Sequence, residues 1–276
     1  MKKLAILGPA GTYSDVAVKK LKEAYEKEYF PSILQAVQAL DATTDVLVPF
    51  ENTLDGFVME SLDAIAGRDG FIAEQVKLNV NFSLVSLAEA IDEIEEVYVQ
   101  FKAYGQCSKF FSTHKVKPIF TQSNMESLSL LKGSTQRNVA AIIPKHCEVK
   151  EFPLVLKNIA DSMDNETRFV RITKSPSNNA TQWATCSVVV VPHMDKSGIL
   201  FSILQSFHNH HINLKAILSR PRRDSIGHYI FYLEFDIELK DIASLEEIRK
   251  ELKEHAFGNM KLIGIYNRLE EELCEQ

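Results

Sequence analysis

The sequence predicts an α/β fold for the first two thirds of the chain, followed by a smaller α+β unit. Short apolar strands alternate with helix-like segments up to about residue 173, which is typical of sheets with helices on their faces. A polar, turn-rich stretch at residues 174–182 then interrupts the pattern and indicates a domain linker. Beyond it the order of elements changes to βαββαβ.

The first part of the chain divides into two lobes. Apolar runs and their spacing predict the elements of the first lobe, which are strands at residues 3–7, 46–48 and 76–87 and helices at residues 14–28, 33–40 and 58–66. A second lobe is expected at about residues 83–157, with strands at residues 96–99, 117–120 and 139–143 and helices at residues 103–111 and 123–132. Ser123 and Glu126 form a capping-box pattern. A strand at residues 167–173 returns to the first lobe, and both sheets should be mainly parallel.

The C-terminal unit has the ferredoxin-like order βαββαβ. We expect strands at residues 184–191, 212–219, 227–237 and 260–266, and helices at residues 197–208 and 244–255. Ser244 and Glu247 suggest a second capping box.

Composition and charge exclude several classes of protein. The chain has 276 residues, 45% hydrophobic and 25% charged, which is ordinary for a globular protein. Its net charge of −6 argues against nucleic-acid binding. The first apolar run, residues 4–7, is too short for a secretory signal, and no stretch is long enough to span a membrane. The four cysteines lack a Cys-x-x-Cys pair, so we expect a cytoplasmic protein with reduced thiols.

Three polar segments follow or enter predicted strands and are candidates for a site. Residues 8–14, Gly-Pro-Ala-Gly-Thr-Tyr-Ser, lie between a strand and a helix, where backbone N–H groups attract anions. Residues 49–56, Pro-Phe-Glu-Asn-Thr-Leu-Asp-Gly, carry two carboxylates, an amide and a hydroxyl, and residues 164–169 carry an arginine able to grip a carboxylate. Each segment has a structural alternative, which is a helix cap for the first two and a surface ion pair for the third.

The His-rich segment at residues 208–211 is not expected to bind a metal, because adjacent histidines diverge and no further ligand completes a set. The sequence also lacks a Gly-x-Ser-x-Gly nucleophile elbow, so nothing in it indicates a serine hydrolase.

Taken together and in this order, the polar segments resemble the prephenate dehydratase family. Residues 8–14 are similar to Gly-Pro-x-Gly-Thr-Tyr-Ser, residues 49–56 to Pro-x-Glu-Asn-Ser-x-Glu-Gly, and residues 165–169 match Asn-x-Thr-Arg-Phe. Residues 102–107 depart more, since only Ala103, Gln106 and Cys107 agree with Gln-Ala-Leu-Ala-Gln-Cys. The C-terminal unit resembles an ACT domain, with Gly-Ile-Leu-Phe at residues 198–201 for Gly-Ala-Leu-Val and Leu-Ser-Arg-Pro at residues 218–221 for Glu-Ser-Arg-Pro.

The resemblance implies a two-lobed catalytic domain of the type II periplasmic-binding class at residues 1–176 and an ACT regulatory domain at residues 184–270. It implies conversion of prephenate to phenylpyruvate, without metal or cofactor, because aromatisation drives the reaction. Thr167 is the catalytic residue that it marks, and Glu51 is a second candidate for the acid if burial raises its pKa. Arg168 is expected to clamp a carboxylate with Phe169 behind it, and the expected substrate donors are Thr12, Asn52, Thr53 and Asn165.

The resemblance also implies feedback inhibition by L-phenylalanine in a homodimer or homotetramer. The expected effector residues are Gly198, Ile199, Leu200, Phe201, Ser219, Arg220 and Pro221. Leu218 replaces a glutamate, which puts effector affinity and preference in question. Two other classes stay open: a solute-binding protein, which would need a signal sequence, and a non-catalytic sensor, which would lack Thr167 and Arg168. Arogenate is the alternative substrate within the same class.

Overall fold

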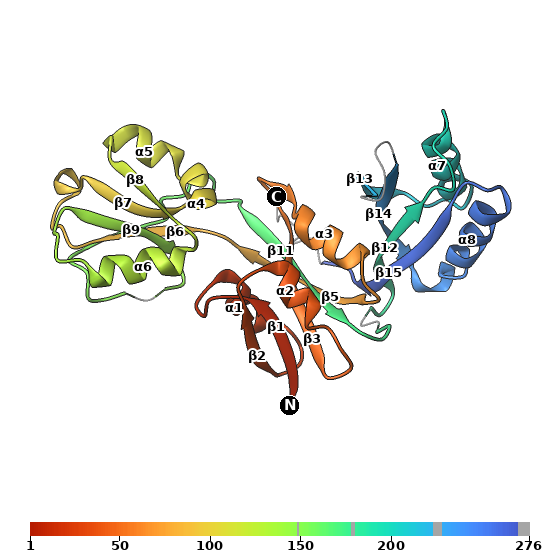
Figure 1. Cartoon of the computed structure of the whole chain (residues 1–276), viewed down its shortest axis with the longest axis horizontal. Helices are drawn as coiled ribbons and strands as arrows, with labels where there is room; N and C mark the ends of the chain where they lie inside the picture. The colour runs from red at the N-terminus through yellow and green to blue at the C-terminus, as the bar shows by residue number, and fades with distance from the viewer. Residues whose placement is uncertain (148, 178–179, 223–227, 270–276) are drawn as a thin grey trace.

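The computed structural model describes residues 1–147, 149–177, 180–222 and 228–269. Three bodies follow one another along its long axis (Figure 1). The N-terminal lobe lies in the middle, the second lobe lies at one end with a sheet of its own, and the C-terminal unit lies at the other end. No helix among the described residues is both long enough and apolar enough to cross a membrane.

The N-terminal lobe is a mixed sheet with helices on both faces. Strand β1 pairs in parallel with β2 and β3, and β11 lies antiparallel between β3 and β5. Leu4 and Ile6 pack on one face with α1, whereas Ala5 packs on the other with α2, as strand alternation requires. The elements of this lobe are β1 (Lys2–Leu7), α1 (Tyr13–Val18), β2 (Tyr25–Phe30), α2 (Ile33–Gln38), β3 (Thr44–Asn52), β4 (Gly56–Phe57), α3 (Met59–Ala66), β5 (Phe71–Asn79) and β11 (Glu166–Thr173).

The second lobe is inserted between β5 and β11, so the chain crosses the boundary twice. Its five strands have the order β10-β6-β9-β7-β8, in which β7 is parallel to β8 and β9 and the other pairs are antiparallel. Its elements are β6 (Phe82–Ser86), the 3₁₀ turn Ile91–Glu93, β7 (Glu96–Gln100), α4 (Phe101–Gln106), α5 (Ser108–His114), β8 (Lys117–Thr121), α6 (Asn124–Gly133), β9 (Val139–Pro144) and β10 (Leu154–Lys157).

The C-terminal unit confirms the predicted βαββαβ order. Its strands have the order β13-β14-β12-β15, and two helices cover one face (Figure 1). The elements are β12 (Trp183–Val191), α7 (Ile199–Asn209), β13 (Leu214–Pro221), β14 (Tyr229–Glu238), the 3₁₀ turn Leu239–Asp241, α8 (Ser244–Glu254) and β15 (Asn259–Asn267).

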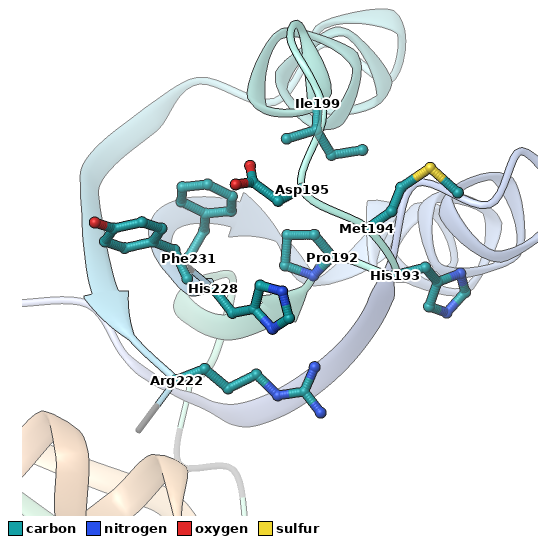
Figure 2. A pocket seen from close by; sticks show the side chains of 9 residues that line it. Pro192, His193, Met194, Asp195, Ile199, Arg222, His228 and Phe231 are labelled. Carbon is teal, nitrogen blue, oxygen red and sulfur yellow. The ribbon is translucent and has the colours of Figure 1, made fainter. Parts of the chain in front are cut away.

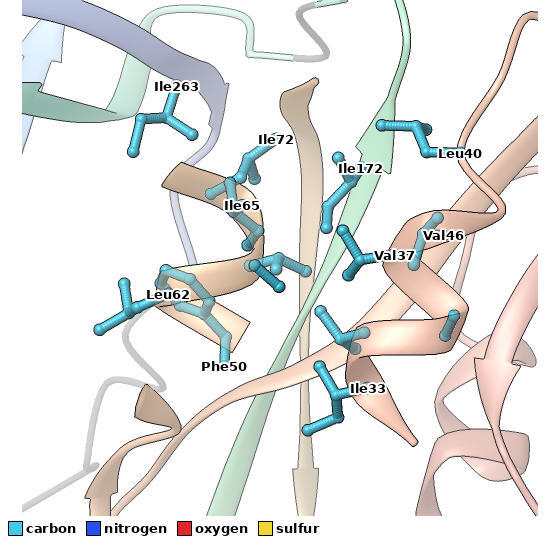
Figure 3. Close-up of a cluster of buried hydrophobic side chains, with 14 of the residues drawn as sticks. Ile33, Val37, Leu40, Val46, Phe50, Leu62, Ile65, Ile72, Ile172 and Ile263 are labelled. Atoms are coloured by element: carbon cyan, nitrogen blue, oxygen red, sulfur yellow. The ribbon is translucent and has the colours of Figure 1, made fainter. Parts of the chain in front are cut away.

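One continuous sheet joins the C-terminal unit to the N-terminal lobe. Strand β15 pairs in parallel with β5, where Gly264 lies opposite Ile72. A Cβ atom at position 264 would lie 2.4 Å from the Ile72 carbonyl oxygen, so only glycine permits this approach. Figure 3 shows the shared core beside this junction, where Ile263 of β15 lies near Ile65 and Ile72.

Several element predictions were wrong in informative ways. The helix expected at residues 14–28 ends at Val18, and residues 25–30 form β2 instead. This edge strand leaves most of its charged side chains exposed, so its sequence lacks the apolar run of a central strand. The strand expected at residues 76–87 is broken into β5 and β6 at the lobe boundary, and the helix expected at residues 103–111 is broken at Cys107.

The two capping boxes have different outcomes. The Ser123 hydroxyl accepts a hydrogen bond from the Glu126 N–H at 3.1 Å, and the Glu126 carboxylate accepts one from the Gln122 N–H, so this cap is confirmed with the return bond shifted by one residue. Helix α8 starts at Ser244 itself, and its cap Ala243 has no side-chain bond, so the second box was wrong.

Candidate active site

A cleft of about 390 Å³ separates the two lobes and is lined by side chains from both. The N-terminal lobe contributes residues from the turn after β1, from β3 and from β11. The second lobe contributes the start of α4 and the start of α6. Among the described residues that line the cleft, Lys102 has the one positively charged side chain, and Asp55 and Glu60 have the negatively charged ones.

The turn after β1 contributes Thr12, Tyr13 and Ser14 to the cleft wall. Its own donors are largely used inside the turn. The Asp15 carboxylate accepts the Gly11 N–H at 3.0 Å, and the Thr12 hydroxyl donates to the Leu7 carbonyl at 3.3 Å. The expected anion site at this turn therefore already holds a carboxylate of the chain itself.

The same turn also contacts the second lobe. The Tyr13 hydroxyl bonds to the backbone of Asn81 at the lobe boundary, and burial raises the pKa of Tyr13 to about 12, which keeps the hydroxyl protonated. Across the cleft, the His146 ring lies 2.8 Å from the Gly11 carbonyl oxygen and donates to it. These contacts hold the two lobes together at one end of the cleft.

Asn52 organises the wall of the cleft where β3 meets β11. Its side-chain nitrogen lies 2.7 Å from Asn165 Oδ1, 3.0 Å from the Glu166 carbonyl and 2.9 Å from Thr167 Oγ1. Its oxygen accepts two backbone N–H bonds from the following loop at 3.0 and 3.1 Å. Asn52 is therefore bonded on every side, and it fixes Thr167 in place.

Thr167, the catalytic residue that the family resemblance implies, lies in the cleft wall. Its oxygen accepts from Asn52, and no acceptor for its own proton occurs within the described part of the chain. The hydroxyl proton is therefore available to a molecule in the cleft. Phe169, two residues further along β11, lines the same wall and is 2% exposed.

Arg168 and Glu51 do not line the cleft, where their expected roles as carboxylate clamp and acid would require them. Successive side chains of a strand point to opposite faces, so the residues next to Thr167 and Asn52 point away from it. Arg168 is buried on the far face, 2.8 Å from Glu51 and 2.8 Å from Glu234 of the C-terminal unit. Burial opposes its charge, but Glu234 and the other anionic neighbours raise the pKa of Arg168 above its usual value.

Thr53 and Asn165 are also outside the cleft lining, and both brace it from behind. The Thr53 hydroxyl donates to the Asp164 carbonyl at 3.1 Å and accepts the Glu166 N–H at 3.0 Å. Asn165 is fully buried and donates to Gln106 of α4 at 2.9 Å. Both residues are therefore held by hydrogen bonds within the protein itself.

Two residues of α4 that sequence reasoning undervalued belong to the cleft. Gln106 links Asn165 to Asp55 across the lobes, and Lys102 supplies the positive charge. Both fall in the segment whose match to the family pattern is poor. The partial agreement at Gln106 was a signal for the first, and no motif indicated Lys102.

The C-terminal unit holds a separate small pocket of about 60 Å³ (Figure 2). It lies between the loop after β12 and the start of β14, and Figure 2 shows Asp195, Arg222 and His228 around it. Of the expected effector residues, only Ile199 lines it. Gly198 caps α7 at a φ of +84°, and Phe201 on the first turn is 68% exposed.

The remaining effector residues, at the end of β13, also lie outside the pocket, as does Leu200 on α7. They are Ser219, Arg220 and Pro221. Arg220 instead forms a two-pronged ion pair with Asp63 of α3, at 2.9 and 2.6 Å. The pocket was missed because its lining comes from the loop at residues 192–195, which carries no recognisable motif. Within the described ranges, no group of three or more potential metal ligands occurs.

Comparisons with known proteins agree with this architecture. The chain is 29% identical to a prephenate dehydratase of Methanocaldococcus jannaschii over 94% of this chain and 95% of the relative. It superimposes on the crystal structure of a prephenate dehydratase from Staphylococcus aureus with a TM-score of 0.81 at 27% identity, covering 96% of this chain and all of that one.

A second solved structure has the same fold. It is a prephenate dehydratase from Arthrobacter aurescens in complex with L-Phe, with a TM-score of 0.83, 24% identity, and coverage of 96% of this chain and 90% of that one. The predicted fold class is thereby confirmed. The ACT domain model matches residues 187–257, and the model described as prephenate dehydratase matches residues 4–177. The prephenate dehydratase model matches more than half of the chain, so the chain belongs to the prephenate dehydratase family.

Proposed function

We propose that this chain converts prephenate to phenylpyruvate in the cleft between its two lobes. The observation that carries the proposal is Thr167, whose hydroxyl faces the cleft, is fixed by Asn52 and keeps its proton for a bound molecule. In the reaction the ring carbon–oxygen bond and the bond to the ring carboxylate break together. Carbon dioxide leaves, the ring becomes aromatic, and the departing hydroxide takes one proton to become water.

Thr167 assists the departing oxygen as a hydrogen-bond donor, and water replaces any proton that it gives up. A threonine hydroxyl is a weak acid, so its contribution depends on being held at the correct place in the transition state. General acid assistance of this kind is worth roughly 10²–10⁴ in rate. Glu51 has no part in this step, because it lies on the other face of the sheet.

The two carboxylates of prephenate need positive charge or aligned donors. We assign one of them to Lys102 and to the N-terminus of α6, which both line the second-lobe side of the cleft. Helix α6 has ten residues, and its N-terminal N–H groups favour an anion. Asn124, in its first turn, also lines the cleft. The chemistry of the reaction requires no cofactor.

We also propose that L-phenylalanine inhibits the enzyme by binding to the ACT domain. The support is the ACT match at residues 187–257 and the L-Phe complex of the Arthrobacter aurescens relative. The described residues that line the pocket in Figure 2 enclose only about 60 Å³. Strand β13 is the edge strand of its sheet, paired with β14 on one side, and its residues alternate in exposure. Pairing of ACT domains along this edge in a homodimer or homotetramer would enlarge the pocket. We place this assembly in the cytoplasm.

Turnover of the purified chain tests the proposal. Prephenate and arogenate are supplied separately, and phenylpyruvate and phenylalanine are measured as the products. We expect phenylpyruvate from prephenate, with the larger kcat/KM for that substrate. Thr167→Ser, which keeps the hydroxyl, is the matched control for Thr167→Ala. Absence of turnover with prephenate would refute the proposal, and preferential formation of phenylalanine would change the substrate to arogenate.

A further inference from the structure

A buried arginine connects the wall of the cleft to the C-terminal unit. Arg168 Nη1 donates to Glu234 at 2.8 Å and to Gln75 at 3.1 Å, while Nη2 lies 2.8 Å from Glu51. Its guanidinium also lies 5.0 Å from the ring centre of Phe50. This cation therefore contacts β3, β5 and β14 at once, on the face of the sheet opposite to the substrate cleft.

Glu234 is held rigidly from its own side. The carboxylate oxygen that does not contact Arg168 accepts hydrogen bonds from the hydroxyls of Tyr232 at 2.8 Å, Tyr266 at 3.0 Å and Ser187 at 3.3 Å. Glu234 is 4% exposed and Arg168 is 8% exposed. Four donors thus converge on one buried carboxylate, which fixes the position of its charge within the C-terminal unit.

The register of the sheet links this ion pair to the proposed catalytic group. Arg168 lies opposite Glu51, and Thr167 lies opposite Asn52 on the next rung of the same pair of strands. The Arg168–Glu51 pair forms the ion pair on the face away from the cleft. The Thr167–Asn52 pair forms the hydrogen bond that orients Thr167 on the cleft face. Because a single peptide unit joins Thr167 to Arg168, a displacement of the arginine shifts the threonine as well.

We propose that Glu234, although it lies in the ACT domain, is a positioning residue for the dehydration reaction. It holds Arg168, which in turn sets the rung on which Thr167 and Asn52 face the substrate. The inference rests on the proposed function, since it concerns the rate of that reaction. It gives the C-terminal unit a part in positioning the catalytic group, separate from the binding of any effector.

The test compares two substitutions of glutamate by glutamine in the full chain. Glu234→Gln keeps the shape and removes the charge that faces Arg168. Glu251→Gln is the matched control, because Glu251 pairs with Ser206 and His210 inside the C-terminal unit, away from the lobe junction. Small misplacements of reacting groups cost up to about 10²-fold in rate, so we expect Glu234→Gln to lower kcat about tenfold or more, with KM within about threefold. The control should keep both within about twofold.

A double-mutant cycle separates positioning from loss of folded protein. Rates are expressed per folded molecule, measured by circular dichroism at the assay temperature. Arg168→Gln and the double variant with Glu234→Gln should have the same kcat, because both substitutions interrupt one path. If Glu234→Gln does not fold, Tyr266→Phe keeps every charge, removes one donor to Glu234, and should lower kcat by about threefold.

The outcomes are distinct. A wild-type chain without prephenate turnover refutes the proposed function itself. A wild-type chain that is active, together with a folded Glu234→Gln variant of unchanged kcat, overturns the positioning role alone. Additive losses of kcat in the double variant would also overturn it, because they would show that Arg168 and Glu234 act independently. If Tyr266→Phe is the variant used, an unchanged kcat also overturns the positioning role of Glu234 and leaves the proposed function intact.

Discussion

Asn52→Asp replaces one NH₂ group by oxygen at the centre of the proposed site. The nitrogen of Asn52 faces three oxygens, those of Asn165, Glu166 and Thr167, at 2.7 to 3.0 Å. A carboxylate at this place would meet the Asn165 and Glu166 oxygens as an acceptor facing acceptors, and the Thr167 hydroxyl would turn to donate its proton to the carboxylate. The side-chain oxygen that caps the following loop would keep its two bonds, so the substitution removes donors and changes little else.

The size of the effect follows from those contacts. A hydrogen bond contributes about 0.5–1.5 kcal/mol net, so the loss of the two bonds to Asn165 and Glu166 predicts a destabilisation of roughly 1–3 kcal/mol at pH 7. At about 2–4 °C per kcal/mol for chains near this size, the melting temperature should fall by roughly 2–12 °C. Because the Thr167 proton would then bond to the new carboxylate and no longer be available in the cleft, kcat should fall by about 10²-fold, as expected when a positioned acid is misplaced.

The sign of the pH dependence gives an independent check. Acceptors around the new carboxyl favour its protonated form, so its folded pKa should lie above its unfolded value of about 3.9. A group with a raised folded pKa stabilises the protein fully below the unfolded pKa, and this contribution is lost as pH rises through the folded pKa. The deficit against wild type should therefore shrink as pH falls from 7 towards about 4.

Thermal unfolding at several pH values and prephenate turnover measure these effects. Asn79→Asp is the control, because the exposed Asn79 side chain makes one hydrogen bond, to the Met163 carbonyl at 2.9 Å. It should cost about 1 kcal/mol or less. If Asn52→Asp matches this control in melting temperature and in kcat, the argument that Asn52 organises the site is wrong.

Three further predictions follow from the site and the domain junction. Thr167→Ala should lower kcat by about 10²-fold with little change in KM, and a near-normal kcat would remove Thr167 from the mechanism. Gly264→Ala should destabilise the chain by about 1–3 kcal/mol in thermal unfolding, because its Cβ would lie 2.4 Å from the Ile72 carbonyl, whereas Gly133→Ala, where a Cβ meets no atom within 4 Å, should be tolerated. Calorimetry and rate assays with L-phenylalanine should show binding and inhibition together, and neither effect at millimolar concentration would refute the regulatory proposal.

The sequence motifs identified the correct strands but not the faces of those strands. Asn-x-Thr-Arg-Phe located Thr167 and Phe169, which line the cleft, and strand alternation then requires Arg168 to point away. A motif that contains an arginine suggests a clamp for an acidic substrate, and only the tertiary structure shows that Arg168 is already ion-paired with Glu234 and Glu51. Lys102 was not predicted for the complementary reason, because its cleft position depends on how the second lobe packs.

The C-terminal unit shows the same limit. Its βαββαβ order could be predicted because each element carries its own periodicity and turn residues. The contact between Arg220 and Asp63 could not be predicted, since it joins β13 to a helix 157 positions earlier in the chain. Arg220, one residue of the motif that suggested effector binding, thus joins the C-terminal unit to α3 of the N-terminal lobe.

The sheet that runs from β5 into β15 limits how this molecule can be divided. A shortened chain ending near residue 176 would keep every cleft residue, but it would leave β5 as a bare edge and Arg168 without Glu234. It would also uncover Phe50, whose ring packs against Tyr232 with centres 5.9 Å apart. Such a fragment should aggregate when expressed alone, because an open strand edge pairs readily with other chains and a buried charge without a partner destabilises the fold. The boundary between the two parts is therefore clear in the sequence, but the catalytic part should not be soluble without the C-terminal unit. A replacement of the regulatory domain by another would have to keep the glycine at position 264.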